Sequence, residues 1–202
     1  MDENNVREPS KDSMNGTADE YFELVLRARP DFRELNNAIE QAAQIIASCF
    51  KNGGKVLICG NGGSAADAQH IAGELVVRYF RERKAYPAIT LSADSSVMTA
   101  CSNDYGYEHV FKRQVEALGK KGDVLIGIST SGSSPNVVHA VEYAKQNSIY
   151  TIGLLGKKGC KLAGMVDTAI CIESGITPII QIWHSIAYHS LCHRIEILME
   201  QS

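Results

Sequence analysis

The sequence predicts an α/β fold: a three-layer sandwich with a five-stranded, mainly parallel sheet and helices on both of its faces. Short apolar runs alternate with longer segments of helical periodicity, as in a parallel sheet joined by crossover helices. Two loops rich in glycine and serine each follow an apolar run directly. The chain has 202 residues, 45% hydrophobic and 21% charged, so it can bury the core of one globular domain.

The two ends of the chain differ in character. Residues 1–18 are polar and are predicted to form a disordered tail, whereas residues 19–202 are predicted to form a single domain. The tail has no apolar segment typical of a secretory signal, and no apolar run approaches the ~20 residues that cross a membrane. The net charge of −3 gives no general attraction to nucleic acid. The six cysteines are scattered without C-x-x-C spacing, which favours reduced thiols in a cytoplasmic protein.

The expected elements alternate along the chain. Residues 19–52 keep a helical apolar rhythm and are predicted to form one helix, which ends at Gly53 and Gly54. The predicted strands are the short apolar runs 55–59, 87–91, 124–128, 150–155 and 168–172. The remaining predicted helices are 64–80, 93–101, 107–119, 135–147 and 178 to the end, with a turn at 102–106.

The first glycine-rich loop joins the strand at 55–59 to the next helix. It contains Asn61, Gly62 and Gly63, and Ser64 is the expected N-cap of the helix. Glycine lets backbone N–H groups approach a ligand, and the helix dipole favours an anion at this position. GNGGS is not the G-x-G-x-x-G fingerprint, and no Gly-Lys-Ser/Thr closes a P-loop, so we expect no nucleotide cofactor.

The second loop follows the strand at 124–128 and contains only serine, threonine and glycine. Its hydroxyl residues include Ser129, Thr130, Ser131 and Ser134, and Pro135 suits the first turn of the next helix. We interpret the loop as a phosphate cradle of hydroxyls and helix N-terminal amides, and the alternative is a solvated loop with ordinary capping. Both loops follow strands, so both should lie at the ligand-binding edge of the sheet.

Two helices carry side chains suited to proton transfer or metal binding. His70 and Glu74 lie one turn apart, where they could ligate one metal or only form a hydrogen bond. Arg78 lies one turn further along, where it could contact substrate or only pair with Glu74. The last helix holds Gln181 and three histidines in a largely apolar segment, at positions His184, His189 and His193. A histidine in such a helix is either a site residue or a satisfied core residue.

These features together resemble the sugar isomerase (SIS) domain family and, within it, the phosphoheptose isomerases. The matching pieces are CGNGGSAADAQHIAGE at 59–74, SNDYGYE at 102–108, GDVLIGISTSGSSPNV at 122–137 and the spacing from Gln181 to His189. The resemblance covers about residues 20 to 200 and implies a flavodoxin-like SIS fold. Members interconvert sedoheptulose 7-phosphate and D-glycero-D-manno-heptose 7-phosphate, the first step toward nucleotide-activated heptose.

The resemblance assigns roles residue by residue. It implies substrate contacts at Asn61, Gly62, Gly63, Asn103, Asp104, Ser129, Thr130, Ser131, Ser134 and Gln181, to which we add Ser64, His70, Glu74 and Arg78 as candidates. The zinc ligands would be His70, Glu74, Gln181 and His189. Glu74 and His189 would be the acid–base pair that shuttles a proton through an enediol. Because a zinc-bound carboxylate is a weaker base, zinc could act as an organiser of the site.

The approach to Gln181 departs from the family pattern. Some members carry an aspartate just ahead of this glutamine, where the present chain has the segment 175–178, Gly-Ile-Thr-Pro. Many flank it with arginine and glutamate, where this chain has Ile179 and Ile182. These positions bear on recognition of the sugar hydroxyls.

The spacing of Gln181 and His189 also bears on assembly. On a straight helix, eight residues separate them by ~12 Å along the axis and ~80° around it. One copy of the helix would barely place both at one metal, so we expect a homo-oligomer with shared sites, and the family is tetrameric. Two alternatives stay open: a non-catalytic SIS module that binds a phosphosugar or a protein partner, and an isomerase of another sugar phosphate.

Overall fold

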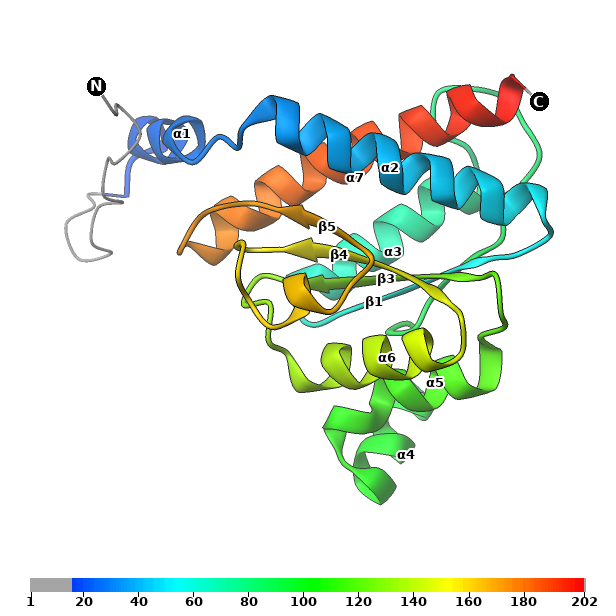
Figure 1. The fold of residues 1–202 in the computed structure, drawn as a ribbon. Helices are drawn as coiled ribbons and strands as arrows, with labels where there is room; N and C mark the ends of the chain where they lie inside the picture. The colour runs from blue at the N-terminus through cyan, green and yellow to red at the C-terminus, as the bar shows by residue number, and fades with distance from the viewer. Residues whose placement is uncertain (1–15, 202) are drawn as a thin grey trace.

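The computed structural model describes residues 16–201 and contains a five-stranded sheet in the order β2-β1-β3-β4-β5 (Figure 1). All neighbouring strands pair in parallel, which confirms the predicted fold class. The strands are β1 (Val56–Gly60), β2 (Ala88–Thr90), β3 (Val124–Ser129), β4 (Tyr150–Leu155) and β5 (Thr168–Cys171). The chain leaves β1 to one side and returns as β3 on the other, so the switch in strand order lies between the strands that precede the two predicted loops.

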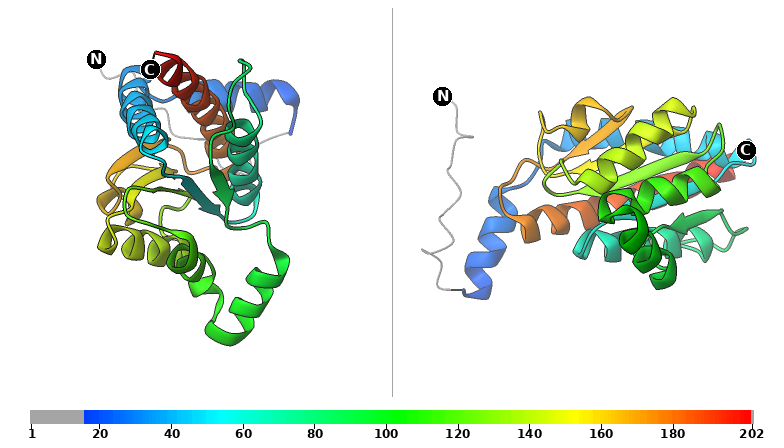
Figure 2. Two further views of the ribbon diagram at one scale, coloured as in Figure 1. Left: turned by 90° about the vertical axis from the view of Figure 1, so that its right-hand side faces the viewer. Right: turned by 90° about the horizontal axis from the view of Figure 1, so that it is seen from below.

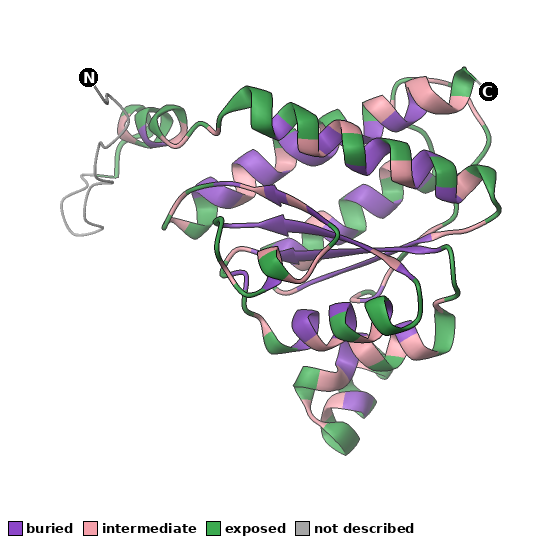
Figure 3. Ribbon diagram, in the orientation of Figure 1, coloured by how far each residue is buried: buried purple, intermediate pink, exposed green. Residues whose placement is uncertain are grey.

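Helices cover both faces of the sheet, as Figures 1 and 2 show. One layer consists of α2 (Phe32–Lys51), α3 (Gly63–Val76) and α7 (Thr177–Glu200), and the other of α4 (Ser95–Tyr105), α5 (Val110–Leu118) and α6 (Pro135–Gln146). Alternate residues of each strand face the two layers, so that Ile58 and Ile126 join one core and Leu57 and Leu125 the other. Figure 3 shows that the residues of the central strands are buried.

The predicted helix at 19–52 is two helices, α1 (Ala18–Arg27) and α2. Pro30 lies between them and accounts for the break. Proline lacks a backbone N–H and disfavours helical backbone in the residue before it. The Asp31 carboxylate then caps α2 by accepting hydrogen bonds from the backbone N–H groups of Arg33 and Glu34. Of the predicted tail, residues 1–15 lie outside the described part, and Thr17 is the N-cap of α1.

The predicted turn at 102–106 is mostly helical. Helix α4 runs through Asn103 and Asp104 to Tyr105, and the break comes at Gly106, whose φ of 94° favours glycine. A single 3-10 turn, η2 (Tyr107–His109), then leads into α5. Asn103 and Asp104, which were predicted to lie in a turn, are therefore part of a helix.

Helix α3 ends at Val76 rather than at residue 80, and a buried ion pair holds the segment that follows it. Arg83 Nε lies 2.9 Å from Glu196 Oε1 of α7, and the two side chains are 9% and 1% exposed. The backbone N–H groups of Tyr79 and Phe80 also donate to Glu196, each at 3.0 Å. Arg83 donates to the backbone carbonyl of Glu74 at 2.7 Å, so this cluster fixes the last turn of α3 against α7.

Among residues 16–201, none of the helices combines the length and apolar character needed to cross a membrane.

Candidate active site

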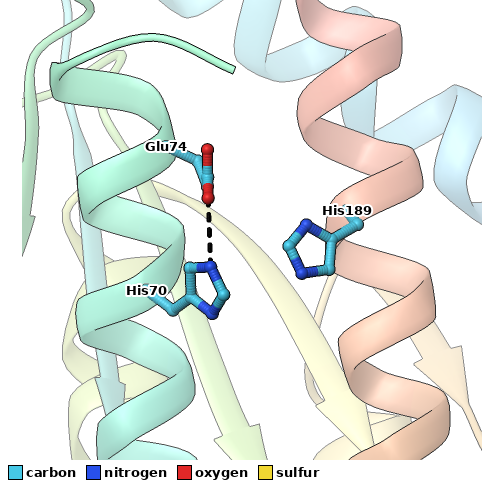
Figure 4. Close-up of side chains that lie close together, drawn as sticks. All are labelled: His70, Glu74 and His189. Atoms are coloured by element: carbon cyan, nitrogen blue, oxygen red, sulfur yellow. Dashed lines mark hydrogen bonds and ion pairs between the residues drawn. The ribbon is translucent and has the colours of Figure 1, made fainter. Parts of the chain in front are cut away.

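His70 and Glu74 of α3 meet His189 of α7 in the described chain (Figure 4). His70 Nε2 lies 3.0 Å from Glu74 Oε1, and one ligand atom from each of the three residues lies within 4.8 Å of the others. The rings of His70 and His189 are 4.9 Å apart, centroid to centroid, at 83°. Helices α3 and α7 pack side by side, and this contact brings together residues that are more than a hundred positions apart.

The surroundings favour the neutral form of His189. Burial and the nearby His70 lower the pKa of His189, and the Glu74 charge only partly opposes them. Its Nδ1 atom is buried and has no hydrogen-bond partner among the described residues. A neutral imidazole with a free nitrogen can bind a metal or accept a proton.

The three side chains fit a zinc ion in the kind and placement of their donors. Two imidazoles and one carboxylate are ordinary zinc ligands, and three protein ligands are typical of a catalytic zinc site. Tetrahedral zinc with ligands near 2.1 Å sets their atoms ~3.4 Å apart, so only a small closure from the observed spread is needed. The unpartnered Nδ1 atom of His189 supports the same fit.

The fourth predicted zinc ligand, Gln181, lies elsewhere on α7 in the single chain. Its amide packs against Gly63 at the start of α3, where a Cβ on that glycine would lie 2.3 Å from Gln181 Nε2. Gln181 precedes His189 by eight residues, or ~12 Å along a helix axis. The cluster within one chain consists of His70, Glu74 and His189.

The glycine loop after β1 is held by an amide pair that we did not predict. Asn61 Nδ2 donates to Asn136 Oδ1 at 2.9 Å, and Asn136 Nδ2 donates back to Asn61 Oδ1 at 2.8 Å. The Tyr107 hydroxyl also donates to Asn61 Oδ1, at 2.9 Å. Asn136 is 2% exposed, and its only sequence signal was its place just after Pro135. The Asn61 side chain is thus largely occupied in joining the two loops.

The predicted N-cap at Ser64 is wrong. The N-cap of α3 is Gly62, with φ of 55°, and Ser64 lies inside the helix with 4% exposure. A positive φ is easy for glycine alone, so the turn selects Gly62 at this point.

The serine loop after β3 gathers its hydroxyl groups. Ser129 Oγ lies 2.9 Å from Ser134 Oγ and 3.3 Å from Ser131 Oγ, at the start of α6. A cavity of about 600 Å³ opens beside the loop and is lined in part by Thr130, Ser131 and Lys157. Lys157 follows β4, and its position in the lining could not be predicted from its own sequence context. The hydroxyls, the helix N-terminus and Lys157 suit a phosphate group, whereas the Glu173 carboxylate in the same lining opposes one.

Comparisons with known proteins identify the family of the chain. The SIS domain profile matches residues 20–156. A phosphoheptose isomerase from Helicobacter hepaticus is 50% identical over 175 residues, which cover 87% of this chain and 89% of that protein. The chain belongs to the phosphoheptose isomerase family of SIS domain proteins. The predicted family is thereby confirmed.

Further family members are similarly close. A phosphoheptose isomerase from Nitratiruptor is 54% identical over 165 residues, covering 82% of this chain and 88% of that protein. The solved structure of the phosphoheptose isomerase from Neisseria gonorrhoeae matches with a TM-score of 0.81 at 40% identity, over 88% of this chain and 96% of that one.

Some candidate substrate residues lie outside the cluster of His70, Glu74 and His189. Asn103 and Asp104 are exposed on α4 and hydrogen-bond to each other at 2.9 Å. Helix α4 belongs to the opposite layer from α3 and α7 (Figure 1). Arg78 is exposed beyond the end of α3, and the ion pair of Glu74 is with His70. Substrate contact by these residues stays a prediction.

The two other histidines of α7 have local partners. His184 is fully buried, its Nε2 lies 3.2 Å from the Leu155 carbonyl oxygen, and burial lowers its pKa to about 4. The His193 ring packs edge-on against Phe80 at 5.0 Å. His184 is therefore a core residue beside the end of β4.

Proposed function

We propose that this chain converts sedoheptulose 7-phosphate to D-glycero-D-manno-heptose 7-phosphate, a step in nucleotide-activated heptose biosynthesis. The proposal is carried by the meeting of the Glu74 carboxylate with the His189 imidazole in a member of the phosphoheptose isomerase family. A binding module needs neither a base nor an acid at this position. Carboxylates and imidazoles are among the side chains that serve as general acids and bases in proton transfer.

The chemistry asks for two proton movements. One group takes a proton from the carbon beside the ketose carbonyl, while the other protonates the carbonyl oxygen to give the enediol. Return of a proton to the former carbonyl carbon, with loss of the neighbouring hydroxyl proton, gives the aldose. We assign these transfers to Glu74 and His189. His70 Nε2 lies 3.0 Å from Glu74 Oε1, so the two side chains face the same point.

The phosphate group would bind in the serine loop. Ser129, Thr130, Ser131 and Ser134 supply hydroxyls there, and Lys157 adds a positive charge at the same cavity. The remaining proposed contacts are with the sugar chain, through Asn61, Gly62, Gly63, Ser64, His70, Glu74, Arg78, Asn103, Asp104 and Gln181.

We further propose zinc as the resident metal, held by His70, Glu74 and His189 with Gln181 as fourth ligand. Bound zinc supplies a Lewis acid that polarises the substrate's oxygens. Because the Gln181 of one chain packs at Gly63, we propose that a neighbouring chain completes each site, in a homotetramer. Mixed oligomers of Glu74→Gln and Gln181→Ala chains test this sharing, since a site that takes Glu74 from one chain and Gln181 from the other is complete and should restore activity. Mixed oligomers as inactive as either parent would contradict it.

The chain's thiols support a reducing location. All six cysteines are free in the structure, and four of them are buried. We therefore propose a cytoplasmic enzyme.

The decisive experiment is direct. Purified protein is incubated with sedoheptulose 7-phosphate, with and without zinc, and an aldose anomeric proton is sought by NMR. We expect turnover that is lost in Glu74→Gln. Turnover of a different sugar phosphate alone would favour the other isomerase reading. Failure on every sugar phosphate, with binding retained, would favour the non-catalytic module.

A further inference from the structure

Tyr188 has a buried hydroxyl that contacts His70, one of the three clustered side chains. It precedes His189 on α7, is 2% exposed, and its Oη lies 3.0 Å from His70 Nδ1. Ser185, one turn earlier, donates its hydroxyl to the same oxygen at 3.0 Å. The rings of Tyr188 and His70 meet edge-on at 5.4 Å. Both nitrogens of His70 are therefore engaged, Nε2 by Glu74 and Nδ1 by Tyr188.

The two ring nitrogens of His70 have different partners and therefore different roles. Nε2 faces Glu74, on the side where the reacting group or metal would sit. A histidine that presents one nitrogen as a lone pair must carry its proton on the other, and that proton needs an acceptor. Tyr188 Oη is the atom in place to accept a hydrogen bond from Nδ1–H.

Asp67 supplies a reason for the Tyr188 hydroxyl to act as an acceptor. It lies one turn before His70 on α3, and its Oδ2 atom is buried without a hydrogen-bond partner among the described residues. Burial raises the pKa of the Tyr188 hydroxyl, and the charge of the Asp67 carboxylate raises it further. A nearby negative charge favours turning the O–H hydrogen toward itself, which leaves an oxygen lone pair for His70.

We infer that Tyr188 is a positioning residue, which with Asp67 holds His70 in the tautomer protonated at Nδ1 and leaves Nε2 as the ligand atom. The inference rests on the proposed function for its metal and concerns two side chains given no role above. In zinc sites such outer partners typically change metal affinity by roughly 10–100-fold. The aromatic ring of Tyr188 packs in the core, so its hydroxyl can be removed with the ring left in place.

The test measures zinc affinity and not turnover. Metal-free wild type and Tyr188→Phe are titrated with zinc against a chromophoric chelator, and we expect at least about tenfold weaker binding in the variant. Tyr143→Phe, on α6 in the opposite layer, is the matched control and should bind zinc as wild type does. Asp67→Asn keeps the side-chain size and should weaken binding in the same direction, even where Tyr188→Phe folds poorly.

The outcomes separate this inference from the proposed function. Unchanged affinity in both Tyr188→Phe and Asp67→Asn, or no zinc binding by the wild type, overturns the positioning role. Weakened affinity in the variants supports it, even where the wild type leaves sedoheptulose 7-phosphate unchanged and the proposed reaction fails.

Discussion

The side chain of Gln181 fills the space that a Cβ atom on Gly63 would need, with its Nε2 2.3 Å from that position. The first turn of α3 and the first turns of α7 therefore meet through a glycine. This close approach sets where the Gln181 amide lies relative to the loop after β1.

Replacement of Gly63 by alanine should move Gln181 without unfolding the protein. The clash is with the end of a flexible side chain, so we expect little change in the free energy of unfolding. Because a small misplacement of a positioning group is costly, kcat/KM should fall by about tenfold or more. Gly73→Ala is the control, since nothing lies within 4 Å of its added Cβ and helix propensity improves by ~1 kcal/mol. Equal activity of both variants would contradict the prediction.

Removal of Arg83 should strongly destabilise the fold. Arg83→Met leaves Glu196, 1% exposed, as a buried charge that has lost its cation. Breaking such a pair costs about 3–5 kcal/mol, measured as the change in free energy of unfolding in urea. Arg81→Met breaks an exposed pair with Glu200 and should cost about 1 kcal/mol or less. Similar losses of unfolding free energy in the two variants would contradict this prediction.

Lys157 should contribute to binding the phosphate end of the substrate. Lys157→Ala removes the lysine that lines the cavity beside Thr130 and Ser131, so KM should rise about tenfold with little change in kcat. Loss of one charge-assisted contact has roughly this size. Lys161→Ala, an exposed lysine nearby in sequence, should leave KM unchanged. A fall in kcat alone would place Lys157 in the chemistry instead.

Acid should destabilise the protein through His184. Its pKa is lowered from 6.5 to about 4 because the side chain is buried, so the unfolded chain binds more protons between these values. The stability that its neutral form provides is complete above pH 6.5 and is lost as the pH falls toward 4. From neutral pH to pH 5 this amounts to about 2 kcal/mol. Urea unfolding, measured with a metal chelator present, should show a smaller acid-induced loss of stability in His184→Gln than in the wild type. An identical pH dependence in the two proteins would contradict the prediction.

The strands were predicted closely, because buried parallel strands are continuous apolar runs such as 124–128 in β3. The helix boundaries were less well predicted, since they depend on single residues. Pro30 divides the first helix, and Gly106 alone ends α4, whereas the polar residues before it looked like a turn. Polar side chains on an exposed helix face and in a loop have the same composition.

Contacts across the fold could not be predicted from local pattern. Arg83 with Glu196 and Asn61 with Asn136 lie 113 and 75 positions apart, and each residue alone is an ordinary polar side chain. The spacing of His70 and Glu74 indicated one face of a helix, but the arrival of His189 beside them needs the packing of α3 on α7. The family resemblance identified His189 as the third residue of the cluster, whereas hydrophobic periodicity could not identify it.

The amide pair of Asn61 and Asn136 has a consequence for selectivity. It fastens the turn that precedes α3, the helix of His70, to the first turn of α6. The two ends of a sugar phosphate bound as proposed would lie against one rigid frame, so we expect the site to select substrates by length. A ketose one carbon shorter would reach only one end of that frame. The site would then select substrates by the number of their carbons as well as by the stereochemistry of their hydroxyl groups.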